Sequence, residues 1–280
     1  MADARERYLR IQQELGGREV ILSRQAGRGA DGQTGRDVSG SGGEGQSESR
    51  RMEPPGSGPS AGPPARPSAW QKGAPPVPTE PGITIPAQTR DLLEAGQVWP
   101  DLGAVEQAIA GCRKCLLCEG RTRTVPGEGN PRAGLLFVGE GPGQTEDETG
   151  RPFVGRAGEL LTQIIEAIGL RRPDVFICNA VKCRPPGNRK PLPDEMAACR
   201  PYLERQIELV EPRVIVALGA TAAEALLGSR RSLGELRNRV HSFRGIPLVV
   251  TYHPAALLRN PNWKKPTWDD VRIARQLLDR

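Results

Sequence analysis

Four short apolar runs in the second half of the chain limit its fold more than any other feature. They are LLFV from Leu135, VFICNAV from Val175, VIVALG from Val214 and PLVVTY from Pro247. Continuous apolar runs of this length are typical of parallel strands that are buried on both faces, because a strand with one wet face would alternate. The sequence therefore predicts strands over 135–140, 175–181, 214–219 and 247–252.

Helical patterns alternate with these strands. They cover residues 155–168, 193–209, 221–227 and 268–278. The prediction is an α/β fold, a three-layer sandwich with a central, mostly parallel four-stranded sheet. Functional loops are expected where the strands end, because ligands of such sheets bind at the carboxyl edge.

Composition divides the chain into three parts. Residues 1–25 favour a short helix, with Tyr8, Ile11 and Leu15 on one face. Residues 26–95 are rich in Gly, Ser, Pro and charge, and they predict a disordered linker that has too little apolar surface to offset its ordering entropy. Residues 96–280 predict the folded domain, which is long enough to bury a core.

The charge is concentrated in the predicted domain. The chain has a net charge of +6, and the first 95 residues contribute none of it. A basic domain suggests a polyanionic partner. The sequence has no membrane-length apolar run and no apolar signal segment after MADARERYLR. A cytoplasmic location without membrane contact is therefore expected, and the cysteines are expected to be reduced.

Four of the six cysteines are spaced as metal ligands. Cys112 and Cys115 form a CxxC pair, and Cys183 and Cys199 flank a proline-rich loop. Four thiolates suit an iron–sulfur cluster or zinc, and the spacing leaves both open. Cys118 extends the first pair without the Cys-Pro of a ferredoxin pattern. Cys178 lies within an apolar run, as a core cysteine would.

The loop GEGPG after the first strand is not a known nucleotide fingerprint. Gln144 stands where GxGxxG needs glycine, and no Gly-Lys-Ser/Thr follows. A phosphate nest or a tight structural turn both remain open. Asn179 and His253 lie at two other strand ends, so their side chains are expected to meet near this loop.

Taken together, these segments resemble one known family. GEGPGQTEDETGRPFVGRAGELL, NAVKCRPPGNRKP and YHPAALLRNP, preceded by CRKC, resemble the iron–sulfur uracil-DNA glycosylases, the family-four branch of their superfamily. The resemblance covers roughly residues 105–280. It implies a DNA repair enzyme that flips uracil out of DNA and hydrolyses its N-glycosidic bond, leaving an abasic site.

The resemblance assigns roles to the base pocket. Phe153 would stack on the flipped base, and Asn179 would read its Watson–Crick edge. His253 would donate to uracil O2 and stabilise the departing base. Glu140 and Gly141 correspond to the loop that places the attacking water. Glu140 stands where the best-known branch has aspartate, so it is expected to act as base, to orient water or to stabilise the sugar cation.

The resemblance also implies contacts around the pocket. Asn188 would assist the water, and Leu257 or Leu258 would fill the gap left by the flipped base. Phosphates would meet Arg259, together with Arg184 and Arg189 of the basic loop. Cys112, Cys115, Cys183 and Cys199 would hold a [4Fe–4S] cluster, with Cys118 outside the set. Of the acidic run, Asp147 is expected to brace the loop, and Glu146 and Glu148 to be solvated.

Two alternatives are weighed against this interpretation. A non-catalytic iron–sulfur DNA-binding module would keep the cysteines without needing Phe153, Asn179 and His253 together. A branch that bonds covalently to the sugar uses a loop histidine, and the loop VKCRPPGNRKPLP has none. The expected partner is uracil-containing DNA, bound by a monomer. A sliding clamp or a single-strand-binding protein is a candidate partner for the N-terminal tail.

Overall fold

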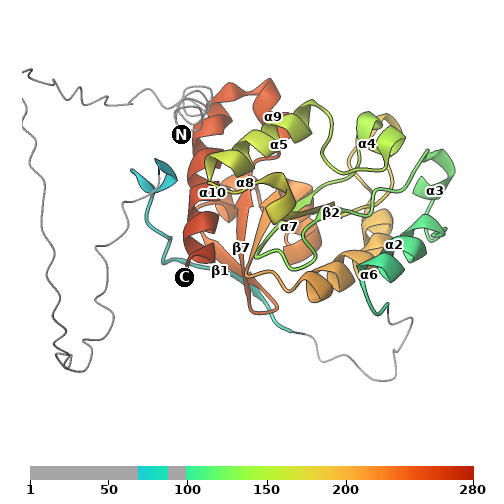
Figure 1. The fold of residues 1–280 in the computed structure, drawn as a ribbon, viewed down its shortest axis with the longest axis horizontal. Coiled ribbons are helices and arrows are strands. Elements are labelled where there is room, and N and C mark those ends of the chain that lie inside the picture. Colours follow the sequence, from blue (N-terminus) through green and yellow to red (C-terminus); the bar gives the residue numbers. More distant parts are fainter. Residues whose placement is uncertain (1–68, 88–98) are drawn as a thin grey trace, which may run out of the picture. The chain divides into compact units, whose positions relative to one another are not determined.

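A seven-stranded sheet forms the centre of the protein (Figure 1). The computed structural model describes residues 69–87 and 99–280. Its strands lie in the order β1-β6-β7-β5-β3-β4-β2. Their bounds are β1 Pro81–Ile85, β2 Glu128–Gly129, β3 Leu135–Gly139, β4 Phe176–Asn179, β5 Val214–Leu218, β6 Val240–Phe243 and β7 Ile246–Thr251.

The four predicted strands are β3, β4, β5 and β7, and they form a parallel centre. The predicted α/β class is confirmed, but the sheet is wider than the four strands predicted. β6 pairs antiparallel with β7, β2 pairs antiparallel with β4, and β1 pairs parallel with β6. These edge strands are short or partly exposed. They therefore lack the continuous apolar run that marks a central strand.

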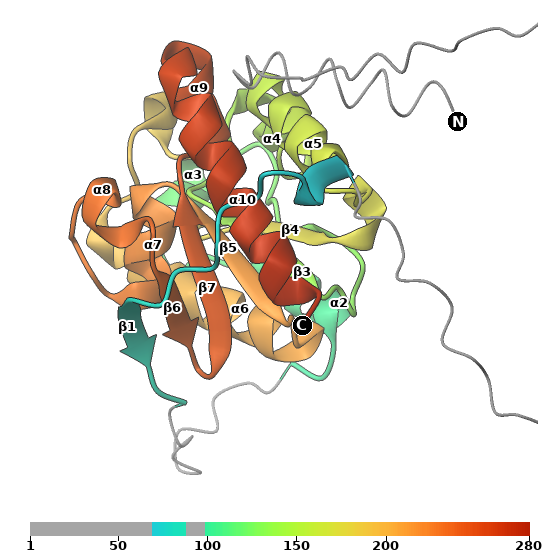
Figure 2. The same cartoon turned by 90° about the vertical axis from the view of Figure 1, so that its left-hand side faces the viewer.

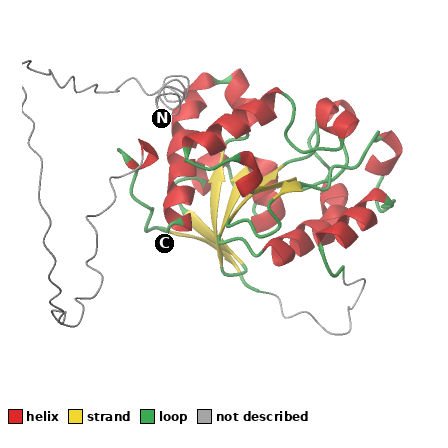
Figure 3. Ribbon diagram, viewed as in Figure 1, coloured by secondary structure: helices red, strands yellow, loops and turns green. Residues whose placement is uncertain are grey.

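Helices cover both faces of the sheet, as Figures 2 and 3 show. The α-helices are α2 Leu102–Ala110, α3 Leu117–Gly120, α4 Gln144–Thr149, α5 Arg156–Ala167, α6 Pro193–Val210, α7 Ala220–Leu227, α8 Leu233–Leu236, α9 Pro254–Arg259 and α10 Lys264–Leu278. The 3₁₀ turns are η1 Ala69–Gln71, η3 Arg172–Asp174, η4 Pro186–Asn188 and η5 Pro261–Trp263.

Successive residues of each central strand enter different cores. In β3, Leu135 and Phe137 pack with α5 and α10, whereas Leu136 and Val138 pack with α6 and α7. This alternation follows from the two-residue repeat of a strand. Cys178 is fully buried in the second core, so the prediction of a plain core cysteine is confirmed.

Residues 69–87 differ from the disordered linker predicted over 26–95. Trp70 is 5% exposed and joins the core beneath α10, where Arg272 donates to its carbonyl oxygen at 2.8 Å. From there the segment runs across α10 to β1 at the sheet edge (Figure 2). Gln276 fixes this crossing by donating to the Pro75 carbonyl oxygen at 2.8 Å. Composition missed the segment because one aromatic anchor and main-chain pairing need few apolar residues.

A buried histidine fixes β1 to its neighbour. The main-chain N–H of Ile83 donates to Nδ1 of His241 at 2.9 Å, and Nε2 of the same ring lies 2.7 Å from the Leu236 carbonyl oxygen. Both contacts are satisfied by a neutral ring that carries its proton on Nε2. Gly82 is required beside it, because a Cβ there would lie 2.4 Å from the Val240 carbonyl oxygen.

The helix predicted over 1–25 and the rest of the predicted linker lie outside the described residues. The division of the chain into three parts therefore stays a prediction. Within the described residues, none of the helices has both the length and the apolar character needed to cross a bilayer.

We expect residues 69–87 to stabilise the domain. A chain that begins at residue 99 should be less stable than one that begins at residue 69 by about 2–4 kcal/mol, because it exposes β6 and empties the Trp70 site. For a domain of this size the thermal midpoint should fall by roughly 5–15 °C, measured by calorimetry. Trp70→Ala in the longer chain should reproduce part of the loss. Equal midpoints for the two chains would contradict a stabilising role.

Candidate active site

A cavity of about 340 Å³ lies at the carboxyl ends of β3, β4 and β7. It is lined by Glu140, Gly141, Pro142, Gly143, Glu146, Phe153, Ala157, Asn179, Pro185, Asn188, Arg189, His253, Ala255 and Arg259. The parallel strands bring these segments to one edge of the sheet, as this fold class predicts. All residues predicted to be catalytic or base-binding lie in this lining, although their roles remain predictions.

Phe153 forms one wall of the cavity. It is 5% exposed, and its ring centroid lies 5.4 Å from that of His253. Its backbone is left-handed, with φ of 51°, which is strained for a residue with a Cβ. Two glycines make room for this conformation. A Cβ on Gly139 would lie 2.5 Å from the Phe153 ring, and one on Gly158 would lie 1.9 Å from its carbonyl oxygen.

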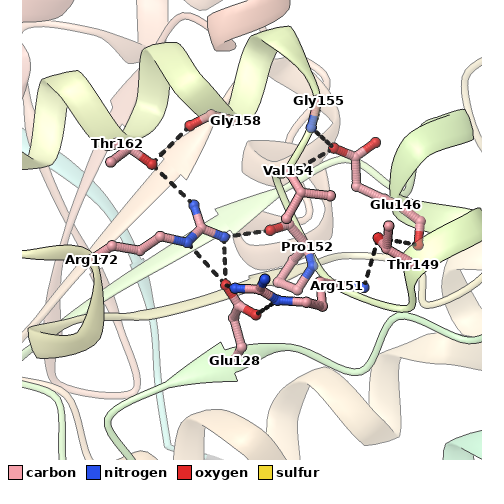
Figure 4. A network of polar contacts seen from close by, with 10 residues as sticks. All are labelled: Glu128, Glu146, Thr149, Arg151, Pro152, Val154, Gly155, Gly158, Thr162 and Arg172. Carbon is pink, nitrogen blue, oxygen red and sulfur yellow. Dashed lines mark hydrogen bonds and ion pairs between the residues drawn. The ribbon is translucent and has the colours of Figure 1, made fainter.

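Hydrogen bonds hold the chain on both sides of Phe153 (Figure 4). After Phe153, Glu146 accepts from the N–H groups of Val154 and Gly155 at 2.9 and 2.8 Å. Before it, the Pro152 carbonyl oxygen accepts from Arg172 at 2.5 Å. Glu146 also lines the cavity, so the expectation that it is a solvated surface charge is wrong. Asp147 braces the loop as predicted, since it is buried and accepts from the N–H of Thr122 at 3.0 Å.

Asn179 places an amide at the floor of the cavity. The side chain is 1% exposed, and Oδ1 has no hydrogen-bond partner. Within the described residues it is the single buried side-chain N or O atom in this state. Such an atom has lost its water without gaining a donor, which is unfavourable unless a ligand supplies one. Asn179 lines the cavity, and its Oδ1 and the Phe153 ring both border the position that a Cβ on Gly139 would occupy.

A buried lysine fixes the backbone of Asn179. Nζ of Lys182 donates to the Asn179 carbonyl oxygen at 2.7 Å and to Gln206 Oε1 at 2.6 Å. Lys182 is 1% exposed, so its ammonium group is buried. Gln206 donates in turn to the Pro126 carbonyl oxygen at 2.8 Å. Buried hydrogen bonds therefore fix the floor of the cavity.

His253 is present as the neutral tautomer with its proton on Nε2. Nδ1 accepts from the N–H of Ala255 at 3.1 Å, where the histidine caps the start of α9. Burial, with a smaller contribution from Arg259, lowers the pKa of His253 to about 4. A neutral imidazole in this tautomer offers one N–H donor to a ligand.

Glu140 and Asn188 approach the cavity from different loops. Oε2 of Glu140 accepts from Thr221 Oγ1 at 2.5 Å, which orients the carboxyl group. Asn188 has a left-handed backbone with φ of 55°, and its Oδ1 accepts from Arg184 at 2.8 Å. Arg184 lies outside the cavity lining, and Arg189 lies within it, paired with Glu195 at 2.7 Å.

One predicted DNA contact is corrected by burial. Leu257 is fully buried in the core with α5 and α10, so it cannot enter a DNA duplex. Leu258, the other candidate, is 41% exposed. The sequence alone could not separate the two, because a helix turns adjacent residues by about 100° and the neighbouring faces were unknown. Arg259, at the end of the same helix, lines the cavity.

The predicted cysteine ligands come from two segments that meet. Cys183 and Cys199 are buried with Leu117, and Cys115 packs against this cluster. Cys112 is close enough to interact electrostatically with Cys115 and Cys183. Burial raises the pKa of Cys199 to about 11, so this thiol ionises only when a cation compensates it. In residues 69–87 and 99–280, no three Cys, His, Asp or Glu side chains are grouped as ligands of a single ion.

Sequence reasoning missed residues that act from behind the cavity. Thr221 bonds Glu140, Arg172 donates to the Pro152 carbonyl oxygen beside Phe153, and Lys182 bonds the backbone of Asn179. These contacts join positions that are distant in the sequence. No spacing rule marks them, so they become visible only in the folded chain.

Comparison with known proteins identifies the family. The sequence profile described as the Uracil DNA glycosylase superfamily matches residues 126–274, which is more than half of the chain. A type-4 uracil-DNA glycosylase of Thermotoga maritima is 51% identical over 180 residues, covering 63% of this chain and 94% of the relative. One from Sulfurisphaera tokodaii is 46% identical over 188 residues, covering 63% and 84%. A type-5 uracil-DNA glycosylase of Thermus thermophilus is 36% identical over 182 residues, covering 58% and 83%.

The chain is a type-4 member of the uracil-DNA glycosylase superfamily. The matched region of this type-4 chain contains the whole cavity lining, from Glu140 to Arg259. Cys112 and Cys115 precede the matched region, whereas Cys183 and Cys199 lie within it. The resemblance inferred from the sequence is confirmed.

The pKa of His253 can be tested directly, because the type-4 chain has two histidines. We expect its imidazole to titrate near pH 4 in an NMR titration, with His253→Gln used for assignment. The unfolded chain takes up this proton near pH 6.5, the unperturbed value, and the folded chain only near 4. The stability that depends on the neutral ring is therefore complete above about pH 6.5 and is lost as the pH falls toward 4. An inflection of the His253 signal near pH 6.5 would contradict this.

Proposed function

We propose that this protein excises uracil from DNA by hydrolysing the N-glycosidic bond, leaving an abasic site for repair. The observation that carries the proposal is the unpartnered Oδ1 of Asn179, buried beside the Phe153 ring in a cavity suited to one base. An aromatic wall and a fixed amide are the two elements needed to hold a flipped base. The type-4 relatives, which are named for this activity, support the same conclusion.

The side-chain amide of Asn179 can select the base, because its oxygen accepts a hydrogen bond and its nitrogen donates one. Oδ1 of Asn179 accepts from N3–H of uracil, and Nδ2 donates to O4. Cytosine presents an acceptor at N3 and a donor at N4, so the same amide would oppose it at both atoms. Lys182 holds the Asn179 backbone, and the burial of the side chain, which is 1% exposed, restricts rotation of its amide. Phe153 stacks on the base and contributes binding without selecting it.

His253 assists departure of the base. Its Nε2–H donates to uracil O2, where negative charge grows as the glycosidic bond breaks. That hydrogen bond is stronger in the transition state than in the bound substrate, so it accelerates the reaction. The lowered pKa keeps the ring neutral at physiological pH. It therefore acts as a hydrogen-bond donor and not as an acid.

Glu140 and Asn188 act on the other side of the bond. The Glu140 carboxyl group, oriented by Thr221, stabilises the positive sugar and orients water for attack on its C1′ atom. Asn188 lines the same cavity and supplies a second polar group for that water. Gly141 also lines the cavity, and a Cβ on it would lie 2.8 Å from the Val181 side chain, so a larger residue there would displace its neighbours.

DNA contacts surround the mouth of the cavity. Leu258 fills the space in the duplex left by the flipped base, since it is the exposed leucine of α9. Arg259, Arg184 and Arg189 contact phosphates. Arg189 contributes least to this charge, because it is paired with Glu195.

We propose that Cys112, Cys115, Cys183 and Cys199 hold a [4Fe–4S] cluster. The fit rests on Cys115 packing against the buried Cys183 and Cys199, with Cys112 close enough to interact electrostatically with Cys115 and Cys183. Arg121 donates to Cys183 Sγ at 3.2 Å. When bound, a cluster would link Cys112 and Cys115, in the segment before β2, to Cys183 in the loop after β4 and to Cys199 in α6.

The remaining proposals concern partners. The protein is proposed to act as a monomer. Uracil-containing DNA is the substrate, and a sliding clamp or a single-strand-binding protein is the proposed partner of the N-terminal residues. The reduced thiols that the cluster needs fit a cytoplasmic location.

Single-turnover base release tests the proposed activity. The protein should release uracil from an oligonucleotide that contains one uracil, so that alkali then cleaves the strand at the abasic site, and a thymine control should stay intact. Asn179→Asp should lower the rate by about 100-fold or more, because a carboxylate cannot donate to O4 and a buried charge replaces the amide. The exposed Asn262→Asp should behave as the unchanged protein.

Other outcomes would identify the alternatives. A folded protein that binds DNA and releases no base would favour the non-catalytic DNA-binding module. A protein–DNA adduct that survives denaturation would favour the covalent branch. Wild-type rates in Asn179→Asp would show that this residue does not read the base.

The cluster can be tested by colour and metal content. Protein purified without oxygen should be brown, absorb near ~400 nm and contain about four iron atoms per chain. Changing any one of the four proposed ligands to alanine should reduce both the absorbance and the iron content, whereas Cys118→Ala should leave both unchanged. A colourless protein that contains zinc would contradict the assignment.

A further inference from the structure

Phe153 is held by contacts on its neighbours. Its left-handed backbone has φ of 51°, a conformation that a residue with a Cβ seldom adopts unless its surroundings enforce it. The preceding carbonyl oxygen, of Pro152, accepts from Arg172 Nη2 at 2.5 Å. The two following N–H groups, of Val154 and Gly155, donate to Glu146. Figure 4 shows the contact of Arg172 with Pro152 and those of Glu146 with Val154 and Gly155.

Arg172 is itself fixed from several directions. Its Nε and Nη2 atoms donate to one oxygen of Glu128 at 2.9 and 2.7 Å. Nη1 lies 3.3 Å from Thr162 Oγ1, which donates to the Gly158 carbonyl oxygen at 3.1 Å. The arginine side chain is 18% exposed. These contacts fix the guanidinium group in the position from which it donates to the Pro152 carbonyl oxygen.

The two residues of this contact come from outside the cavity. Glu128 lies on β2 and Arg172 on η3, and neither lines the cavity. They connect the edge of the sheet to the loop that carries Phe153. An ion pair far from the reacting atoms thus fixes the main chain at the aromatic wall.

We propose that Arg172, held by Glu128, is a positioning residue that sets the angle and depth of Phe153 and thereby the stacking of the flipped base. The pair Glu128 and Arg172 is called the Phe153 brace below. This inference rests on the proposed function, since it assigns the brace to base binding. The brace acts through main-chain geometry and does not touch the base.

Arginine is needed for this arrangement and lysine would not replace it. The planar guanidinium bonds Glu128, Thr162 and the Pro152 carbonyl oxygen from fixed directions. A lysine ammonium could keep the ion pair with Glu128, but it could not reach all three with the same geometry. Arg172→Lys therefore separates loss of charge from loss of position.

The neighbouring arginine provides a matched control. Arg151 also bonds Glu128, with Nε at 2.8 Å, but its side chain is 62% exposed. Its side chain donates to Glu128 and not to the Pro152 carbonyl oxygen. Arg151→Lys thus alters the same carboxylate with the same substitution and leaves the Phe153 loop bonded to Arg172.

The experiment measures affinity for free uracil, single-turnover base release and affinity for uracil-free DNA. Arg172→Lys should weaken uracil binding and slow base release by about tenfold or more, because small displacements of a positioned group have large effects on rate. Affinity for uracil-free DNA should stay within about twofold, since phosphate contacts are unchanged. Arg151→Lys should match the wild type in all three measurements.

A double-mutant cycle with Phe153→Ala distinguishes positioning from a general structural role. If the brace acts through Phe153, Arg172→Lys should have no further effect on uracil affinity once the ring is absent. Equal effects with and without the ring would overturn the proposal, as would unchanged uracil binding in Arg172→Lys. If Arg172→Lys does not fold, Glu128→Gln serves instead, with the same expected and contrary results.

The outcomes also separate this inference from the proposed function. Wild-type protein that neither binds free uracil nor releases it from DNA would refute the proposed function itself. Wild-type protein that does both, with Arg172→Lys unchanged, would refute the brace alone.

Discussion

The parallel pairing of Gly139 with Asn179, at the carboxyl ends of β3 and β4, is the constraint on which the rest of the site depends. This register puts a residue without a side chain next to the Asn179 amide that lines the cavity. The space that a Cβ on Gly139 would take is bordered by Asn179 Oδ1 at 2.4 Å and by the Phe153 ring. A shift of one residue would turn Asn179 to the other face of the sheet and close the cavity.

The floor of the cavity and the cysteine cluster are connected through short stretches of backbone. Lys182 bonds the Asn179 carbonyl oxygen and immediately precedes Cys183, and its own carbonyl oxygen accepts from Val125 at 2.8 Å. Val181 donates to the Glu140 carbonyl oxygen at 3.1 Å. The segment from Asn179 to Cys183 thus joins the Asn179 amide, the Glu140 loop and the thiols. A cluster fixed there would order all three at once.

The sequence predicted what depends on local pattern. Continuous apolar runs marked β3, β4, β5 and β7, and the strand-end positions of Asn179 and His253 brought them to one cavity. Contacts between distant segments were not predictable in this way. Strand β1 is held by a tryptophan anchor and main-chain pairing, so its composition resembles that of a linker. The burial of Leu257 likewise depends on neighbours that no local pattern specifies.

The unpartnered Oδ1 of Asn179 has a consequence for evolution. A buried acceptor without a donor destabilises a fold by about 1–3 kcal/mol, so an apolar residue of similar size would make this domain more stable. The asparagine persists only as long as selection maintains the reaction that uses it. A gene copy released from that selection should drift to an apolar residue at this position early, before its core changes. The residue at position 179 would then distinguish gene copies that keep the activity from copies that have lost it but still fold.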